Sequence, residues 1–143
     1  MTAFDLEAWA ATAHVTPFPK AKQPGDLLVL GDMESTVSLA ERAGNYVVES
    51  DSHGGRRKLI GSFSNQEDAV RTVVYWIGSG SAGRDPGAGN DLAGATLDRS
   101  PISVHLSWPG GSAEFGPGRT GELWAARFNW ARDKTLEQVA SAF

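Results

Sequence analysis

The side chains that most often carry catalysis are few in this sequence and lie far apart. Its three histidines, at positions 14, 53 and 105, are not within metal-ligand spacing of one another. Glu67 and Asp68 form a carboxylate pair suited to acid–base chemistry, but capping and the helix dipole explain both in the first turn of a predicted helix. The motifs HExxH, GxSxG, Walker A and GxGxxG are absent. We therefore expect no enzyme activity, no cofactor and no metal site.

A glycine-rich segment, about residues 78–101, invites a test for phosphate binding. Eleven of the 17 glycines lie between positions 78 and 121. Phosphate-cradling loops run from a strand into the start of a helix, whereas this segment leaves a predicted helix and enters a predicted strand. We interpret it as a flexible surface loop, and a ligand-binding loop is the alternative.

Charged residues on constrained turns are the candidates for contact with a partner. Arg119 is a single long cation in the turn 116–121, where glycines and a proline flank it; an ordinary solvated arginine is the alternative. The candidate partner-binding residues are Gly118, Arg119, Thr120, His53, Arg56, Arg84 and Asp85. His53 and Arg56 belong to a predicted turn, and Arg84 and Asp85 to the glycine-rich segment. We predict that Arg119 enters the active-site cleft of a protein partner.

Composition excludes several classes of protein. The 143 residues contain no cysteine, so disulfides, thiolate zinc sites and iron–sulfur clusters are excluded. The 13 Lys and Arg against 17 Asp and Glu give a net charge of -4, which disfavours nucleic acid as a partner. The run 56–58 is interpreted as a solvated strand start. No apolar run approaches the roughly 20 residues of a membrane span, and Asp5 and Glu7 stand where a signal peptide is basic, so we expect a cytoplasmic protein without membrane contact.

Apolar patterning predicts an α+β fold. Strands are expected at 27–30, 34–41, 46–48, 58–63, 102–108 and 123–130, with brief pairing at 113–115. Helices are expected at the N-terminus with Thr2 as cap, from a capping box Ser64–Glu67 to Gly78, and at 136–143. The five tryptophans are interpreted mainly as core, with interface anchors as the alternative. We expect a single domain, residues 1–143, with a mostly antiparallel sheet of about six or seven strands and helices packed on one face.

Two long stretches carry a resemblance to a known family. They are GNYVVESDSHGGRRKLIGSFSNQEDAVRTVVYWIG, followed by the glycine-rich stretch with Arg84, and SAEFGPGRTGELWAARFNWARDKTLEQVASAF at the end. The chain resembles actinobacterial immunity proteins of polymorphic-toxin systems over most of residues 27–143, and especially the antitoxins that neutralise the tuberculosis necrotizing toxin. That resemblance implies a small cytosolic α+β protein without catalysis, which binds its cognate secreted toxin, as those antitoxins bind an NAD-glycohydrolase, and blocks the toxin's active site. The protein would be a monomer alone and a heterodimer with the toxin.

Two other functions stay open. The first is another binding module, such as a chaperone-like adaptor of a secretion system or a carbohydrate binder that uses exposed tryptophan. The second is an enzyme built from scattered Asp, His and Arg residues, which a pocket joining His105 to two carboxylates would favour.

Overall fold

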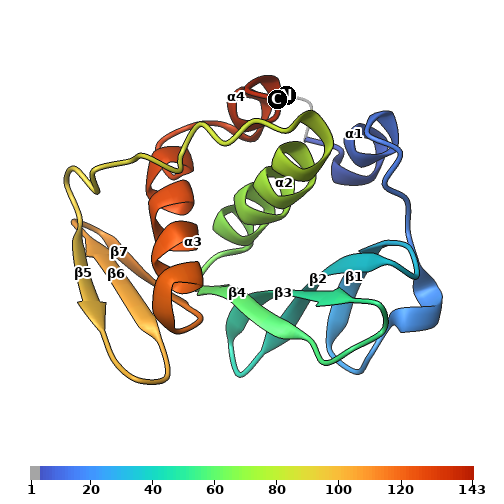
Figure 1. Cartoon of the computed structure of the whole chain (residues 1–143), viewed down its shortest axis with the longest axis horizontal. Helices are drawn as coiled ribbons and strands as arrows, with labels where there is room; N and C mark the ends of the chain where they lie inside the picture. The colour runs from blue at the N-terminus through green and yellow to red at the C-terminus, as the bar shows by residue number, and fades with distance from the viewer. Residues whose placement is uncertain (1–3) are drawn as a thin grey trace.

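A seven-stranded antiparallel sheet forms one layer of the molecule, and the helices form a second layer on one of its faces (Figure 1). The computed structural model describes residues 4–143. In sheet order the strands are β1 (Asp26–Gly31), β2 (Ser35–Arg42), β3 (Asn45–Ser52), β4 (Lys58–Phe63), β7 (Gly111–Phe115), β6 (Val104–Trp108) and β5 (Thr96–Arg99). The helices are α1 (Leu6–Thr12), a 3-10 turn η1 (Pro19–Ala21), α2 (Gln66–Ala82), α3 (Gly118–Ala131) and α4 (Leu136–Ser141). The predicted α+β class is confirmed.

The sheet is assembled from two units that each run from strands into a helix. The first is the meander β1–β4 followed by α2, and the second is β5–β7 followed by α3. They join where β4 pairs with β7, with Gly61 opposite Phe115 and Phe63 opposite Ala113. Because β7 and not β5 pairs with β4, the second unit adds to the sheet in reverse order, and β5 becomes an outer strand.

The predicted strand 123–130 is wrong, because this segment is the middle of helix α3. Trp124 and Phe128 are four residues apart. This spacing places two side chains on the same face of a strand or on the same face of a helix, so it does not distinguish the two. The tertiary structure decides the matter: Gly121, Trp124, Ala125 and Phe128, three or four positions apart or adjacent, all lie on the buried side of α3 that packs on the sheet and on α2. The strand that does pair here is β7, which is longer than the predicted 113–115.

Three helix boundaries differ from the predicted ones. Asn65, and not Ser64, caps α2, since its side chain accepts a hydrogen bond from the Asp68 N–H at 2.8 Å. The helix also runs past Gly78 to Ala82 and ends at Gly83 in the left-handed conformation. Asp5 caps α1 through the Ala8 N–H, while the predicted cap Thr2 lies outside the described residues.

The core lies between the sheet and the α2 and α3 helices. Its aromatic centre is Phe63, Phe115 and Phe128, whose ring centroids lie 4.9–5.9 Å apart. Gly78 is buried in α2 because the Phe143 ring occupies the place of a side chain there, with Cδ2 only 2.3 Å from an ideal Cβ. The C-terminal residue is therefore packed onto the helix layer.

Candidate functional site

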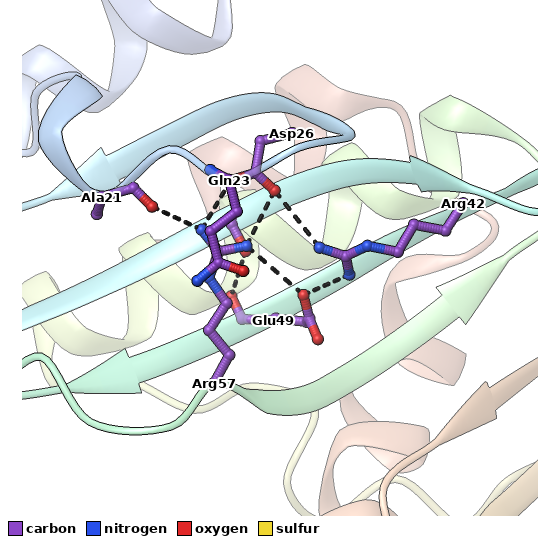
Figure 2. Close-up of polar contacts among 7 residues, drawn as sticks. Ala21, Gln23, Asp26, Arg42, Glu49 and Arg57 are labelled. Atoms are coloured by element: carbon purple, nitrogen blue, oxygen red, sulfur yellow. Dashed lines mark hydrogen bonds and ion pairs between the residues drawn. The ribbon is translucent and has the colours of Figure 1, made fainter.

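A cluster of two arginines and two carboxylates lies across the first four strands (Figure 2). Asp26 begins β1, Arg42 ends β2, Glu49 lies within β3, and Arg57 precedes β4. We call these four residues the Asp26–Arg57 network. The Arg57 guanidinium donates two hydrogen bonds to the Asp26 carboxylate, at 2.9 and 2.7 Å, and a third to the Ala21 carbonyl oxygen at 2.9 Å. The network thereby connects η1 to β1, β2, β3 and the residue immediately before β4.

The two central charges are removed from solvent. The Asp26 side chain is 0% exposed and that of Arg57 only 8%. Arg42 donates to Glu49 at 2.5 Å and lies 3.6 Å from Asp26, and Glu49 lies 3.7 Å from Arg57. The predicted solvated strand start at 56–58 is therefore wrong for Arg57, whereas Arg56 and Lys58 are exposed.

The pKa of the Asp26 carboxyl is set by opposing effects. Burial by itself raises it, but the hydrogen bonds from Arg57 and the Gln23 N–H, with the charges of Arg57 and Arg42, bring it below its ordinary value. The same hydrogen bond raises the pKa of Arg57 above its ordinary value. Both groups are therefore held in their charged forms, and each has its partners within the protein. This arrangement suits a structural staple better than a proton-transfer site.

A second polar network ties the glycine-rich segment to the helices. Asp85 accepts two hydrogen bonds from Arg127 of α3, at 3.0 and 2.7 Å, and one from the Tyr75 hydroxyl of α2. The Tyr75 oxygen in turn accepts the Gly87 N–H at 2.8 Å. Arg127 also stacks on Trp124, with its guanidinium carbon 4.4 Å from the ring centroid.

These contacts shift two pKa values in opposite directions. The hydrogen bond from Arg127 lowers the pKa of Asp85, against a smaller opposing effect of burial. Burial, together with the hydrogen bond to Asp85, raises the pKa of the Tyr75 phenol. The start of the glycine-rich segment is thus fastened to α2 and α3, and residues up to Ala82 are helical. Only part of the predicted loop 78–101 is irregular, because β5 begins at Thr96.

The predicted partner-binding residues fall on three parts of the surface. Gly118, Arg119 and Thr120 are exposed, but they form the first turn of α3 and not a hairpin tip. His53 and Arg56 are exposed in the β3–β4 turn, and Arg84 is exposed beyond the end of α2. The structure does not bring the three groups into one cluster: Figure 1 shows the end of α2 in the helix layer, away from the sheet. The Asp85 carboxylate is engaged within the protein.

His105 lies in β6 opposite Glu114 of β7 and Asp98 of β5. This is the combination of one histidine and two carboxylates that the enzyme hypothesis required. All three residues are exposed, and within residues 4–143 no ion pair links them and no cluster of His, Asp and Glu could hold a metal ion. The row belongs to a solvated sheet face rather than to a pocket.

Several hollows lie on the surface, none of them anticipated from the sequence, and two matter here. The larger of these two, about 490 Å³, lies beside α2 and is lined in part by Trp76 and Trp124. The smaller, about 220 Å³, lies between η1, the β1–β2 turn and the β3–β4 turn and includes Met33 and Asp51. Their residues come from segments distant in the chain, and only the isolated Met33 between two acidic residues gave a local signal. Within the described residues, no helix is long and apolar enough to cross a membrane.

Comparisons with known proteins add a fold relationship. No protein-family model matches the chain, and no curated protein matches it. Among solved structures, the chain is similar to "Rv3902c from M. tuberculosis", with a TM-score of 0.74 and 11% sequence identity over 99% of this chain and 87% of that one. At this identity the similarity shows a shared α+β fold.

Proposed function

We propose that this protein is a cytoplasmic immunity protein, which binds a cognate protein toxin and blocks the toxin's active site. The observation that carries the proposal is that the two carboxylates with shifted pKa values, Asp26 and Asp85, are both neutralised by arginines of the same chain. The features left for function are exposed turns, helix ends and shallow hollows, which suit recognition of another protein.

Two further observations support this proposal. The sequence resembles actinobacterial immunity proteins over most of residues 27–143, and the fold is shared along 99% of the chain with a protein from M. tuberculosis. Of the alternatives, the hypothesis of a carbohydrate-binding module receives little support. None of the five tryptophans is exposed, and Trp124 retains only 8% of its accessible surface. No contact or hollow specifically favours a secretion adaptor.

The proposal is tested with the product of a toxin-like reading frame adjacent to the gene for this protein. We expect a one-to-one complex in calorimetry, loss of toxin activity in the complex, and protection of cells that express both proteins. Failure of the purified wild-type protein to bind or inhibit that toxin contradicts the proposed function.

Arg119→Asp examines the predicted contact in the first turn of α3. Arg119 is exposed and makes no ion pair with residues 4–143, so reversal of its charge leaves the fold intact. If Arg119 enters the toxin's cleft, affinity falls by about tenfold or more. Lys58→Asp makes the same charge change at another exposed cation and serves as the control. Equal affinity of the two variants and the wild type would exclude Arg119 from the interface.

A further inference from the structure

The smaller hollow has the dimensions of a site for a single side chain. We call it the hairpin-end pocket; the residues that matter for its chemistry are Phe18, Lys20, Asp32, Met33, Thr36 and Asp51. Its volume is about 220 Å³. Sites for drug-sized molecules occupy about 300–1,000 Å³, so this pocket is small for a metabolite or cofactor. It can accept one side chain that projects from a protein surface.

The pocket opens on the sheet face opposite to α2 and α3, where η1 supplies one of its sides. Thr36 of β2 and Asp51 of β3 are cross-strand partners, and their neighbour Val37 faces the core. Because side chains alternate along a strand, Thr36 and Asp51 point to the opposite face. Thr36 is 5% exposed and forms the floor, while the side chain of Met33 stands at the rim and is 81% exposed.

The rim is held in place before any partner arrives. One Asp32 carboxylate oxygen accepts the N–H groups of Glu34 and Ser35, at 2.8 and 3.1 Å. The His53 N–H donates to the Glu34 carbonyl oxygen at 2.7 Å, which fastens the β1–β2 turn to the β3–β4 turn. Such preorganisation lowers the entropic cost of binding at an exposed apolar side chain.

Charge and polarity define what the pocket can accept. Its walls are largely apolar, with Phe18 and Met33 among them. The Asp51 carboxylate accepts no hydrogen bond and forms no ion pair within residues 4–143, although the buried charge of Arg57 acts on it from farther away. The second carboxylate oxygen of Asp32 accepts no hydrogen bond within the same residues. Lys20 is the single Lys or Arg in the lining, so two carboxylates outnumber it. An apolar wall that ends in carboxylates complements a long aliphatic stem with a cationic head.

We infer that the hairpin-end pocket is a docking site for an arginine side chain of a protein partner. The inference rests on the proposed function only in taking that partner to be the toxin. The stem of the arginine lies along Phe18 and Met33, and its guanidinium meets Asp51 and the open oxygen of Asp32. Guanidinium is preferred to ammonium here because its planar fork can satisfy two carboxylate oxygens at once.

The first experiment needs no toxin. N-acetyl-L-arginine methylamide is titrated into the ¹⁵N-labelled full chain, and its leucine counterpart into a second sample. We expect saturable shifts at the amides of Met33, Thr36 and Asp51 with the arginine probe, at a dissociation constant of about 1–10 mM. Asp51→Lys abolishes these shifts, and the milder Asp51→Asn weakens binding about threefold or more. Equal shifts with the leucine probe, no saturable shifts, or unchanged binding by Asp51→Asn overturns the inference.

The second experiment uses the toxin complex. Asp51→Lys is expected to weaken toxin binding about tenfold or more in calorimetry. Glu41→Lys, an exposed acidic residue toward the other end of β2, is the matched control and changes affinity less than about twofold. Thermal unfolding of both variants shows whether they are folded. Unchanged affinity in Asp51→Lys removes the pocket from the toxin interface, whereas absence of wild-type binding contradicts the proposed function and leaves the arginine titration to decide the pocket.

Discussion

Asp26→Asn removes one charge from the Asp26–Arg57 network and changes almost no volume. In the wild type, the Asp26 carboxylate is 0% exposed and accepts hydrogen bonds from Arg57 at 2.7 and 2.9 Å and from the Gln23 N–H at 2.7 Å. The variant leaves the Arg57 guanidinium buried, with Glu49 as its remaining negative partner at 3.7 Å. Loss of one member of a buried ion pair costs about 3–5 kcal/mol. Since Glu49 compensates in part, we expect a loss of about 3 kcal/mol at neutral pH.

Urea and thermal unfolding measure this loss. About 3 kcal/mol corresponds to a decrease in Tm of roughly 12 °C for a domain of this size. Glu122→Gln is the control, because the Arg99–Glu122 pair is just as short, at 2.6 Å, but its side chains are 61% and 34% exposed. Exposed pairs contribute little, so the Tm of this control is expected to stay close to that of the wild type. Equal Tm values for the two variants would refute the assignment of a structural role to the network.

The same variant has a defined pH dependence. The folded-state pKa of Asp26 lies below its ordinary value of 3.8. A depressed carboxyl pKa stabilises the folded state fully above the unfolded-state pKa and loses that contribution as the pH falls through the folded-state pKa. The difference in stability between wild type and Asp26→Asn is therefore constant above about pH 5 and disappears in stronger acid. A difference that persists unchanged in acid would show that charge is not its source.

Other side chains give sharper local tests. Tyr75→Phe removes the hydroxyl that bridges Asp85 and the Gly87 N–H, and urea unfolding should show a loss of about 1–3 kcal/mol. A stability equal to that of the wild type would mean that this hydroxyl does not anchor the glycine-rich segment. Gly121→Ala places a Cβ 1.6 Å from a backbone carbonyl oxygen before α3, so we expect a loss of about 3 kcal/mol or more in the same assay. Gly80→Ala meets nothing within 4 Å and should be neutral or stabilising; equal effects of the two glycine variants would contradict the packing argument.

Sequence patterns predicted the elements that are bounded by clear turn-forming or helix-capping residues. The strands β1–β4 were placed within a few residues, because hydrophobic residues and turn-forming residues alternate clearly there. The α3 helix was misassigned, since spacing between Trp124 and Phe128 fits both periods and the glycines before it indicated a turn. Only the tertiary structure shows why a glycine stands at position 121. It packs against the Gly116 carbonyl oxygen in the connection before α3, where a side chain would not fit.

The polar networks were beyond prediction for a different reason. Asp26 and Arg57 are 31 positions apart, and Asp85 and Arg127 are 42 apart. In neither pair do the neighbouring residues in the sequence show whether the charged side chain is buried or exposed to solvent. Arg57 lies between two exposed cations, so its neighbours gave the wrong indication. Its burial depends on tertiary contacts, because its side chain passes Glu49 of β3 and bonds Asp26 at the start of β1.

This placement links the stability of the fold to the proposed docking site. Arg57 holds Ala21 of η1 through its carbonyl oxygen, and the β3–β4 turn that contains Arg57 also supplies His53. Ala21 and His53 both line the hairpin-end pocket, so the Arg57–Ala21 hydrogen bond links the two segments that carry them. Asp26→Asn should therefore weaken binding of the arginine probe although Asp26 does not line the pocket. Glu122→Gln, outside this set of contacts, should leave probe binding unchanged, and equal binding by both variants would show that the pocket does not depend on the network.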